Sequence, residues 1–139
     1  MAVRLGRNCK VCVSGDLVAG MGTWSMDGIS VDQIDITAFG DVYKTFVGGM
    51  VDGGTITFDG WYDPADTSGQ EILRGWNENA TEATTLRLYV DNTSFFIPTT
   101  TNPVSHVTIT SYTISVEKTD VIRSKFTAKV SGKMQLLAA

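Results

Sequence analysis

Apolar and polar residues alternate with a period of two along most of this chain. The clearest run is residues 55–62, where Ile56, Phe58 and Tyr62 alternate with mostly polar neighbours. A period of two is that of a β-strand with one buried and one exposed face. The same pattern covers residues 8–13, 29–37, 84–90, 95–97, 104–116 and 121–131, and a weaker strand, loop and return strand is expected within 14–28. The chain is therefore predicted to be mainly β, with about seven antiparallel strands.

Two of these strands change the parity of their apolar positions part-way along. In residues 29–37 the change falls at Asp32 and Gln33, which predicts a β-bulge. In residues 104–116 a similar change follows Ile109. Both strands are therefore expected to turn different residues inward in their two halves.

One segment has a helical rather than a strand period. Asp63 and Pro64 end the preceding strand, because proline has no N–H to donate. Beyond them Ile72, Leu73 and Trp76 fall on one helical face, which should pack on the sheet. Two residue pairs have the spacing of a capping box that opens a helix: Ser68 with Glu71, and Thr67 with Gln70. The predicted fold is an antiparallel β-sandwich or barrel with one short flanking α-helix.

Residues 38–54 show no clear periodicity and are too long for an ordinary hairpin connection. This expected loop carries many large apolar side chains: Phe39, Val42, Tyr43, Phe46, Val47, Met50 and Val51. Surface loops seldom contain so many unless they fold over the core or bury against a partner. The residues alone leave both possibilities open.

Composition narrows the class of protein. The 139 residues fit a single domain, and 42% hydrophobic with 19% charged residues is typical of a folded chain. A net charge of −4 argues against tight general binding to nucleic acid, which needs cations to neutralise phosphates. Residues 1–7 have no periodicity and are expected to form an N-terminal arm. No stretch has the length of a signal peptide's apolar run or of a membrane span, so cytoplasmic synthesis without membrane insertion is expected.

The sequence offers little for catalysis. Cys9 and Cys12 form a C-x-x-C pair, but a zinc site needs further ligands, and two reduced cysteines are expected. His106 is the only histidine and has no neighbouring nucleophile or acidic cluster in the sequence. Residues 48–55 superficially resemble a phosphate-binding loop, yet glycine stands at 54 where lysine is required. We therefore expect no enzyme activity, no metal site and no cofactor.

Charged residues form rows on the predicted strands. Arg123, Lys125 and Lys129 share one face of the last predicted strand, and three aspartates lie on others: Asp32, Asp35 and Asp59. If copies assemble side by side, acidic rows could meet basic rows and fix the register between subunits. The pattern alone favours the simpler interpretation, in which these are solvated sheet faces.

Residues 47–76 also carry motifs in a characteristic order. A G-G-x-x-x-G-G run at 48–54 precedes a strand that ends in F-x-G-x-Y-D at 58–63, and D-x-x-G-Q-x-x-L-R follows at 66–74. The order and spacing resemble the tail tube (major tail) protein family of long-tailed bacteriophages. Residues 33–37 and 126–133 are similar to two further strands of that family, so the resemblance spans about residues 30–133.

The resemblance implies a structural virion protein that self-assembles into stacked hexameric rings. These would form the hollow tail tube that delivers genomic DNA, which passes through the lumen without specific binding. Residues 38–54 would be the inter-ring stacking loop, and residues 29–37, 55–61 and 121–131 would contribute to an inner barrel. The stacking residues would be Phe39, Val42, Tyr43, Phe46, Val47, Met50 and Asp52. Expected partners are other copies of the chain and the tape measure, terminator and distal tail proteins, with assembly in the host bacterial cytoplasm.

Two other functions remain open at this level. A tail terminator and a type VI secretion tube protein are ring-formers related to the tail tube family. A monomeric β-sandwich that binds a ligand such as carbohydrate could use exposed tryptophans, for which Trp24, Trp61 and Trp76 are available.

Overall fold

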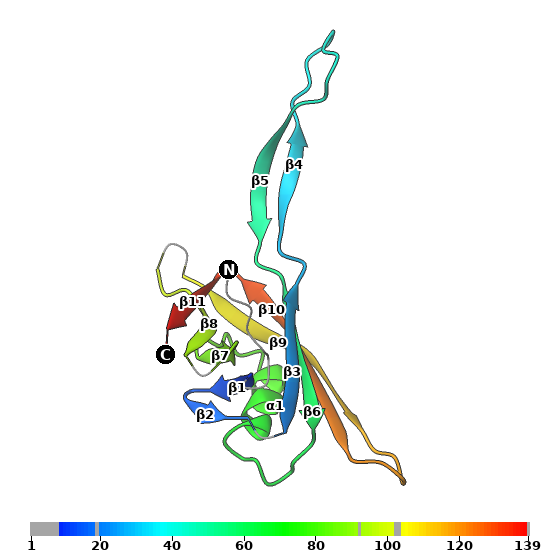
Figure 1. The fold of residues 1–139 in the computed structure, drawn as a ribbon, viewed down its shortest axis with the longest axis vertical. Coiled ribbons are helices and arrows are strands. Elements are labelled where there is room, and N and C mark those ends of the chain that lie inside the picture. Colours follow the sequence, from blue (N-terminus) through cyan, green and yellow to red (C-terminus); the bar gives the residue numbers. More distant parts are fainter. Residues whose placement is uncertain (1–8, 19, 92, 102–103, 139) are drawn as a thin grey trace.

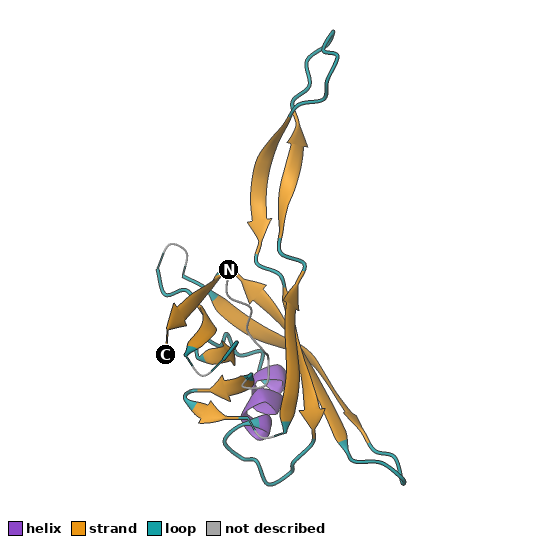
Figure 2. Cartoon of the chain, in the orientation of Figure 1, coloured by secondary structure: helices purple, strands orange, loops and turns teal. Residues whose placement is uncertain are grey.

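The computed structural model describes residues 9–18, 20–91, 93–101 and 104–138 of the chain. The expected arm at residues 1–7 lies outside these ranges. Figure 1 shows a β-rich body from which two hairpins project, one at each end of the long axis. Figure 2 shows that strands dominate and that the described part contains one helix. The mainly β prediction is therefore confirmed.

Two antiparallel sheets form the body. One has the order β11 (Met134–Ala138), β8 (Ser94–Pro98), β7 (Leu86–Tyr89), β1 (Lys10–Val13) and β2 (Asp16–Leu17). The other has the order β3 (Met21–Asp27), β6 (Thr55–Trp61), β10 (Arg123–Ser131) and β9 (His106–Ser115). A separate pair, β4 (Ser30–Asp35) and β5 (Phe46–Asp52), forms the upper projection in Figure 1. The arrangement is a sandwich of open sheets rather than a closed barrel.

One apolar core joins the two sheets. In β10 every second side chain is buried, which is the alternation that the sequence predicts. Phe126 of β10 stacks on Phe58 of β6 with ring centroids 5.5 Å apart. Residues of the five-stranded sheet complete the same cluster, among them Val11, Leu86 and Leu88. The other face of the four-stranded sheet stays exposed, as antiparallel sheets allow.

The helix α1 (Gln70–Glu78) packs against β9 at the flank of the body. Leu73 is fully buried and Trp76 packs on the core, while Ile72 is exposed. The Asn77 side-chain amide donates a hydrogen bond of 2.9 Å to the Ile109 carbonyl oxygen. The expected position of the helix is therefore right, although Ile72 does not face the sheet.

The predicted capping box is wrong. Gly69 occupies the N-cap position, and Asp66 Oδ2 accepts a hydrogen bond of 3.1 Å from the Gln70 amide. The buried Gln70 side chain is turned away from the helix, accepting from the Asp63 amide at 3.0 Å and donating to the Trp61 carbonyl at 2.7 Å. Glu71 is engaged with Arg74 at 3.0 Å. Both side chains that a capping box would use therefore bind elsewhere.

Both parity changes correspond to irregularities in strand pairing. The pairing of β4 with β5 shifts between Val31 and Gln33, which confirms the predicted bulge. In β9, Ile109 pairs with Ala128 and Ser111 with Thr127, so Thr110 is the extra residue. Its hydroxyl donates to the Thr127 carbonyl oxygen at 3.1 Å.

The description of residues 38–54 as an irregular loop is wrong for its second half, which forms β5. Alternation gives no signal there, because nearly every residue of β5 is exposed and neither face is a core face. Gly48 and Gly49 also interrupt the pattern. The described residues form eleven strands rather than about seven, the unexpected ones including β5 and β11.

Candidate assembly surface

The projecting hairpin continues two strands of the body. Asp27 of β3 pairs with Thr55 of β6. Ser30 of β4 pairs with Asp52 of β5, and each of these two residues is three positions further from the body than Asp27 and Thr55. The register is thus the same on both sides of the break between the two strand pairs. We call residues 28–54 the projecting hairpin; Figure 1 shows it extending the line of β3 and β6 beyond the body.

Glycines form the break. Gly28 and Gly54 have φ of +73° and +93°, values that side chains disfavour. A Cβ at Gly53 would lie 2.3 Å from the Gly132 carbonyl oxygen, so only glycine allows this close approach to the end of β10. The Gly54 carbonyl accepts a hydrogen bond of 3.1 Å from the Val130 amide. The base of the projecting hairpin is therefore held directly on β10.

An ion pair holds the same junction. Lys129 Nζ of β10 lies 2.6 Å from Asp52 Oδ1, which also accepts a hydrogen bond of 2.9 Å from the Gly54 amide. The Lys129 hydrogen bond, followed by the Gly54 amide, lowers the pKa of the Asp52 carboxyl. The structure thus places Asp52, expected to be a stacking residue, at the base of the hairpin.

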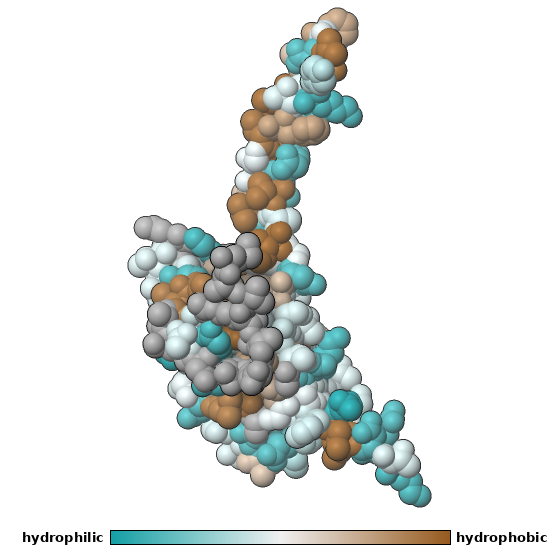
Figure 3. Space-filling view, viewed as in Figure 1, coloured by the Kyte–Doolittle hydropathy of each residue, from teal (hydrophilic) through white to brown (hydrophobic). Residues whose placement is uncertain are grey.

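The large apolar side chains of the projecting hairpin are exposed. At the tip Phe39 is fully exposed, and Val42 and Tyr43 are 90% and 83% exposed. Both strands add further exposed apolar residues: Val31, Ile34, Phe46, Val47, Met50 and Val51, with Ile29 and Ile36 at the ends of β4. Figure 3 shows this apolar surface along the projection. The alternative of a flap over the core is therefore wrong, and so large an exposed apolar surface is typical of an interaction site.

Local hydrogen bonds shape the tip. Asp35 Oδ1 accepts from the Thr37 amide at 2.9 Å, and Thr37 Oγ1 accepts from the Thr45 amide at 2.8 Å. Asp41 Oδ2 accepts from the Ala38 amide at 2.8 Å. Hydrogen bonds from the Thr37 hydroxyl and amide lower the pKa of Asp35. The tip therefore presents its aromatic side chains from a locally bonded turn.

Two glycines of β5 allow side chains of β4 to approach its backbone closely. A Cβ at Gly48 would lie 3.2 Å from Val31 Cγ1, and one at Gly49 would lie 3.2 Å from Ile34 Cδ1. Val31 and Ile34 of β4 therefore lie against the backbone of β5. Sequence reasoning treats these β4 residues as part of a core strand, and it does not reveal that their strand leaves the body.

The charged residues that were expected to pair between subunits have neighbours within the chain. Lys129 binds Asp52 rather than Asp32 or Asp35. Arg123 Nε lies 3.7 Å from Asp120 Oδ2. Lys125 stands directly opposite Asp59 in the pairing of β10 with β6, and Asp59 Oδ1 accepts a hydrogen bond from the Thr23 hydroxyl. Pairing of these residues between subunits stays a prediction.

Two features of the four-stranded sheet also suit assembly. Its outward face is rich in hydroxyl groups, including Thr23, Ser25, Thr57, Thr113 and Thr127. Its two edge strands are β3 and β9. Edge strands present backbone N–H and C=O groups that another chain can pair with.

Other chemistry is sparse in the described residues. Cys9 and Cys12 form no disulfide, and burial raises the pKa of the Cys12 thiol. His106 Nε2 lies 4.0 Å from Glu82 Oε1. Residues 48–55 are strand, turn and strand, without the helix that a phosphate-binding loop requires. Among the described residues, no group of His, Cys, Asp and Glu side chains is placed to hold a metal ion. No described helix could cross a membrane.

The sequence matches no protein-family profile and no curated protein. Solved structures do match over the whole chain. A protein of the tail of an empty gene transfer agent particle, refined with C6 symmetry, has a TM-score of 0.75 at 14% identity, covering 99% of this chain and 100% of its own. This chain has a tail-tube fold.

Two further structures share the tail-tube fold. The sheath/tube terminator of an extracellular contractile injection system matches with a TM-score of 0.72 at 15% identity, over 99% of both chains. The tube-terminating cap of the anti-feeding prophage matches with a TM-score of 0.69 at 15% identity, over 100% of this chain and 95% of its own. The tail, terminator and cap structures thus share one architecture with this chain.

Proposed function

We propose that this chain is a structural virion protein whose copies form rings that stack into a hollow tail tube. The exposed, apolar projecting hairpin carries the proposal, because a ribbon with this surface requires a protein partner to cover it. The tail-tube fold supports the same function, since the matched structures include a particle's tail and a sheath-tube complex. The chain would be part of the virion after assembly in the host bacterial cytoplasm.

Six copies per ring is the arrangement we propose, by analogy with the C6 symmetry of the matched tail. Edge strands β3 and β9 would pair between neighbours, which would extend the four-stranded sheet into a barrel and remove its exposed edges. The hydroxyl-rich outward face would then line the lumen. On that face Lys129 is paired with Asp52, and the net charge of each copy is −4, so DNA could pass without strong binding.

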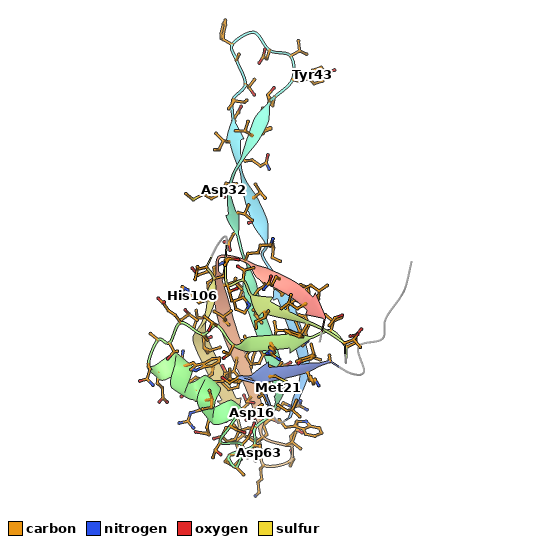
Figure 4. The ribbon with its side chains drawn as sticks, turned by 90° about the vertical axis from the view of Figure 1, so that its left-hand side faces the viewer. Asp16, Met21, Asp32, Tyr43, Asp63 and His106 are labelled. Carbon is orange, nitrogen blue, oxygen red and sulfur yellow. The ribbon has the colours of Figure 1, made fainter. Side chains whose placement is uncertain are left out.

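The hairpin would contact the next ring along the tube. Phe39, Val42 and Tyr43, in the turn between β4 and β5, are exposed and would be buried there. Figure 4 shows Tyr43 at the far end of the projection. Tape measure, terminator and distal tail proteins would meet the inside and the two ends of such a tube. We propose no enzymatic activity and no cofactor for this function.

A tube terminator is the second candidate, favoured by the terminator and cap structures that match over the whole chain. A terminator would form rings without extending them into tubes. The carbohydrate-binding alternative has less support, because Trp24 and Trp76 pack against the core and only Trp61 of the three is largely exposed.

The test compares the intact protein with a variant in which Asn-Gly replaces residues 28–54. Asp27 and Thr55 pair directly, so a two-residue turn can close β3 onto β6. Negative-stain electron microscopy and sedimentation velocity should show tubes for the intact protein, and rings that do not stack for the variant. Rings without tubes for the intact protein would favour the terminator. An intact protein that remains monomeric up to its solubility limit would contradict assembly.

A further inference from the structure

A groove of about 960 Å³ lies at the end of the body opposite the projecting hairpin. The β1–β2 hairpin, the start of β3, the end of β6 and the start of β10 enclose it. In Figure 4, Met21 and Asp16 lie at this end of the molecule, whereas Asp32 and Tyr43 lie along the projection at the other end. Copies arranged in line along the long axis would therefore bring a hairpin toward this groove.

The groove has the apolar chemistry of a docking site. Val18 and Met21 are buried at its base, while Leu17 and Trp61 on its lining are 57% and 61% exposed. A largely exposed tryptophan beside a concave apolar surface is typical of the residues that dominate binding energy in protein interfaces. The hairpin tip offers matching groups, because Phe39, Val42 and Tyr43 project from a turn that local hydrogen bonds maintain.

The two surfaces carry opposite charge. Lys10, Arg123 and Lys125 line the groove with a single carboxylate, that of Asp59. The outer part of the hairpin carries Asp32, Asp35 and Asp41 against Lys44. Two groove cations also have contacts in their own chain: Lys10 lies 4.4 Å from the centre of the Tyr89 ring, and Arg123 lies near Asp120. These contacts hold the cations at the groove, where they would favour an acidic partner.

We propose that the hairpin tip of one copy docks into this groove of the next copy along the tube. The proposal rests on the proposed function and identifies the surface that receives the hairpin. Because the two halves of the contact are different surfaces, the interface is heterologous and can repeat without closing. The receiving copy would contribute Leu17 and Trp61, and the docking copy its tip aromatics.

The test uses two kinds of variant that each destroy one half of the contact. Leu17→Glu places a carboxylate in the groove, and its matched control is Leu136→Glu on β11, at a residue that is also 57% exposed. A tip variant replaces Phe39, Val42 and Tyr43 with serine. Lys125→Glu, with Lys133→Glu as its control, is an independent change in the groove. Circular dichroism melts verify that each variant folds.

Each groove variant and the tip variant should fail to form tubes, or need roughly a hundredfold more protein to do so, because a carboxylate buried against apolar groups is strongly unfavourable. The two controls should assemble like the intact protein. An equimolar mixture of the tip variant with a groove variant should form pairs of rings but no tubes, since one intact hairpin meets one intact groove.

Folded groove variants that form tubes like the controls would overturn the groove assignment and leave the proposed function intact. A mixture without ring pairs would overturn it too, because tip and groove would then not be the two halves of one contact. An intact protein that never forms rings would instead overturn the proposed function itself.

Discussion

Lys129 Nζ lies 2.6 Å from Asp52 Oδ1, joining the end of β10 to the last residue of the projecting hairpin's second strand. The contact lies beside three glycines at which the hairpin departs from the body, Gly28, Gly53 and Gly54. Glycines give this junction backbone freedom, and the ion pair removes part of it. We therefore expect the pair to help set the direction in which the hairpin projects.

Replacing Lys129 with methionine should loosen the projecting hairpin without unfolding the body. Both side chains of the pair are about half exposed, so global stability should change little. Backbone ¹⁵N relaxation should show lower order parameters for β4 and β5, with unchanged values for β6 and β10. Lys125→Met is the matched control, because Lys125 is on the same face of β10 but faces Asp59. Equal order parameters for β4 and β5 in the two variants would mean that the Lys129–Asp52 pair does not restrain the hairpin.

The hairpin contacts of Asp52 and Asp35 should persist at neutral pH and be lost only in acid. Both carboxyl pKa values are lowered by hydrogen bonds in the folded chain. A carboxyl whose pKa is lower in the folded than in the unfolded chain stabilises the fold at pH values above its unfolded-state pKa. This stabilisation is lost as the pH falls through the pKa of the folded state. The loss should therefore occur below roughly pH 4, the ordinary aspartate value.

Carboxyl ¹³C titration of the two aspartates measures this directly. Lys129→Met should raise the pKa of Asp52 toward its ordinary value and leave that of Asp35 unchanged, because Asp35 is held by Thr37. An Asp52 carboxyl that titrates at or above the value of an unfolded peptide would contradict the assignment.

The body of this fold could be predicted from the sequence because its strands have one buried face. In β10 and β6 alternation follows burial residue by residue, and the two parity changes correspond to real pairing irregularities. In the helix, Leu73 and Trp76 both pack on the core, and their spacing of three residues likewise gives a helical period. These signals arise from the hydrophobic core, so they are reliable where the chain packs on itself.

The projecting hairpin could be predicted only in part, for the same reason. Neither face of β5 packs on the core, so periodicity could not identify it as a strand. The apolar tip could be singled out, because composition alone makes Phe39, Val42 and Tyr43 unusual for a loop. The groove that includes Leu17 and Trp61 could not, since it forms only when segments distant in sequence come together, with β1 to β3 on one side and β6 and β10 on the other.

The N-cap residue Gly69 has no side chain, although Asp66 Oδ2 accepts a hydrogen bond from the Gln70 amide, so the helix should depend more on packing than on capping. Leu73→Ala should destabilise the protein by about 2–5 kcal/mol, since it removes a fully buried side chain from the core. The adjacent exposed Ile72→Ala should cost under about 1 kcal/mol. Urea unfolding followed by fluorescence measures both values. Similar losses for the two would mean that the helix is not docked through Leu73.

Gly54→Ala should lower the free energy of unfolding far more than Gly40→Ala. Both glycines have a left-handed backbone, with φ of +93° and +95°. A Cβ at Gly54 would lie 2.5 Å from the Asp27 carbonyl oxygen, whereas one at Gly40 meets nothing within 4 Å. The left-handed conformation alone costs about 1–2 kcal/mol, which the exposed tip can relieve by local rearrangement. Gly54→Ala should therefore lower the free energy of unfolding by more than about 2 kcal/mol, and Gly40→Ala by less than about 1 kcal/mol. Chemical denaturation of the two variants under the same conditions measures both free energies of unfolding. Equal losses of stability would mean that the backbone conformation makes Gly54 necessary, and that its contact with β3 does not.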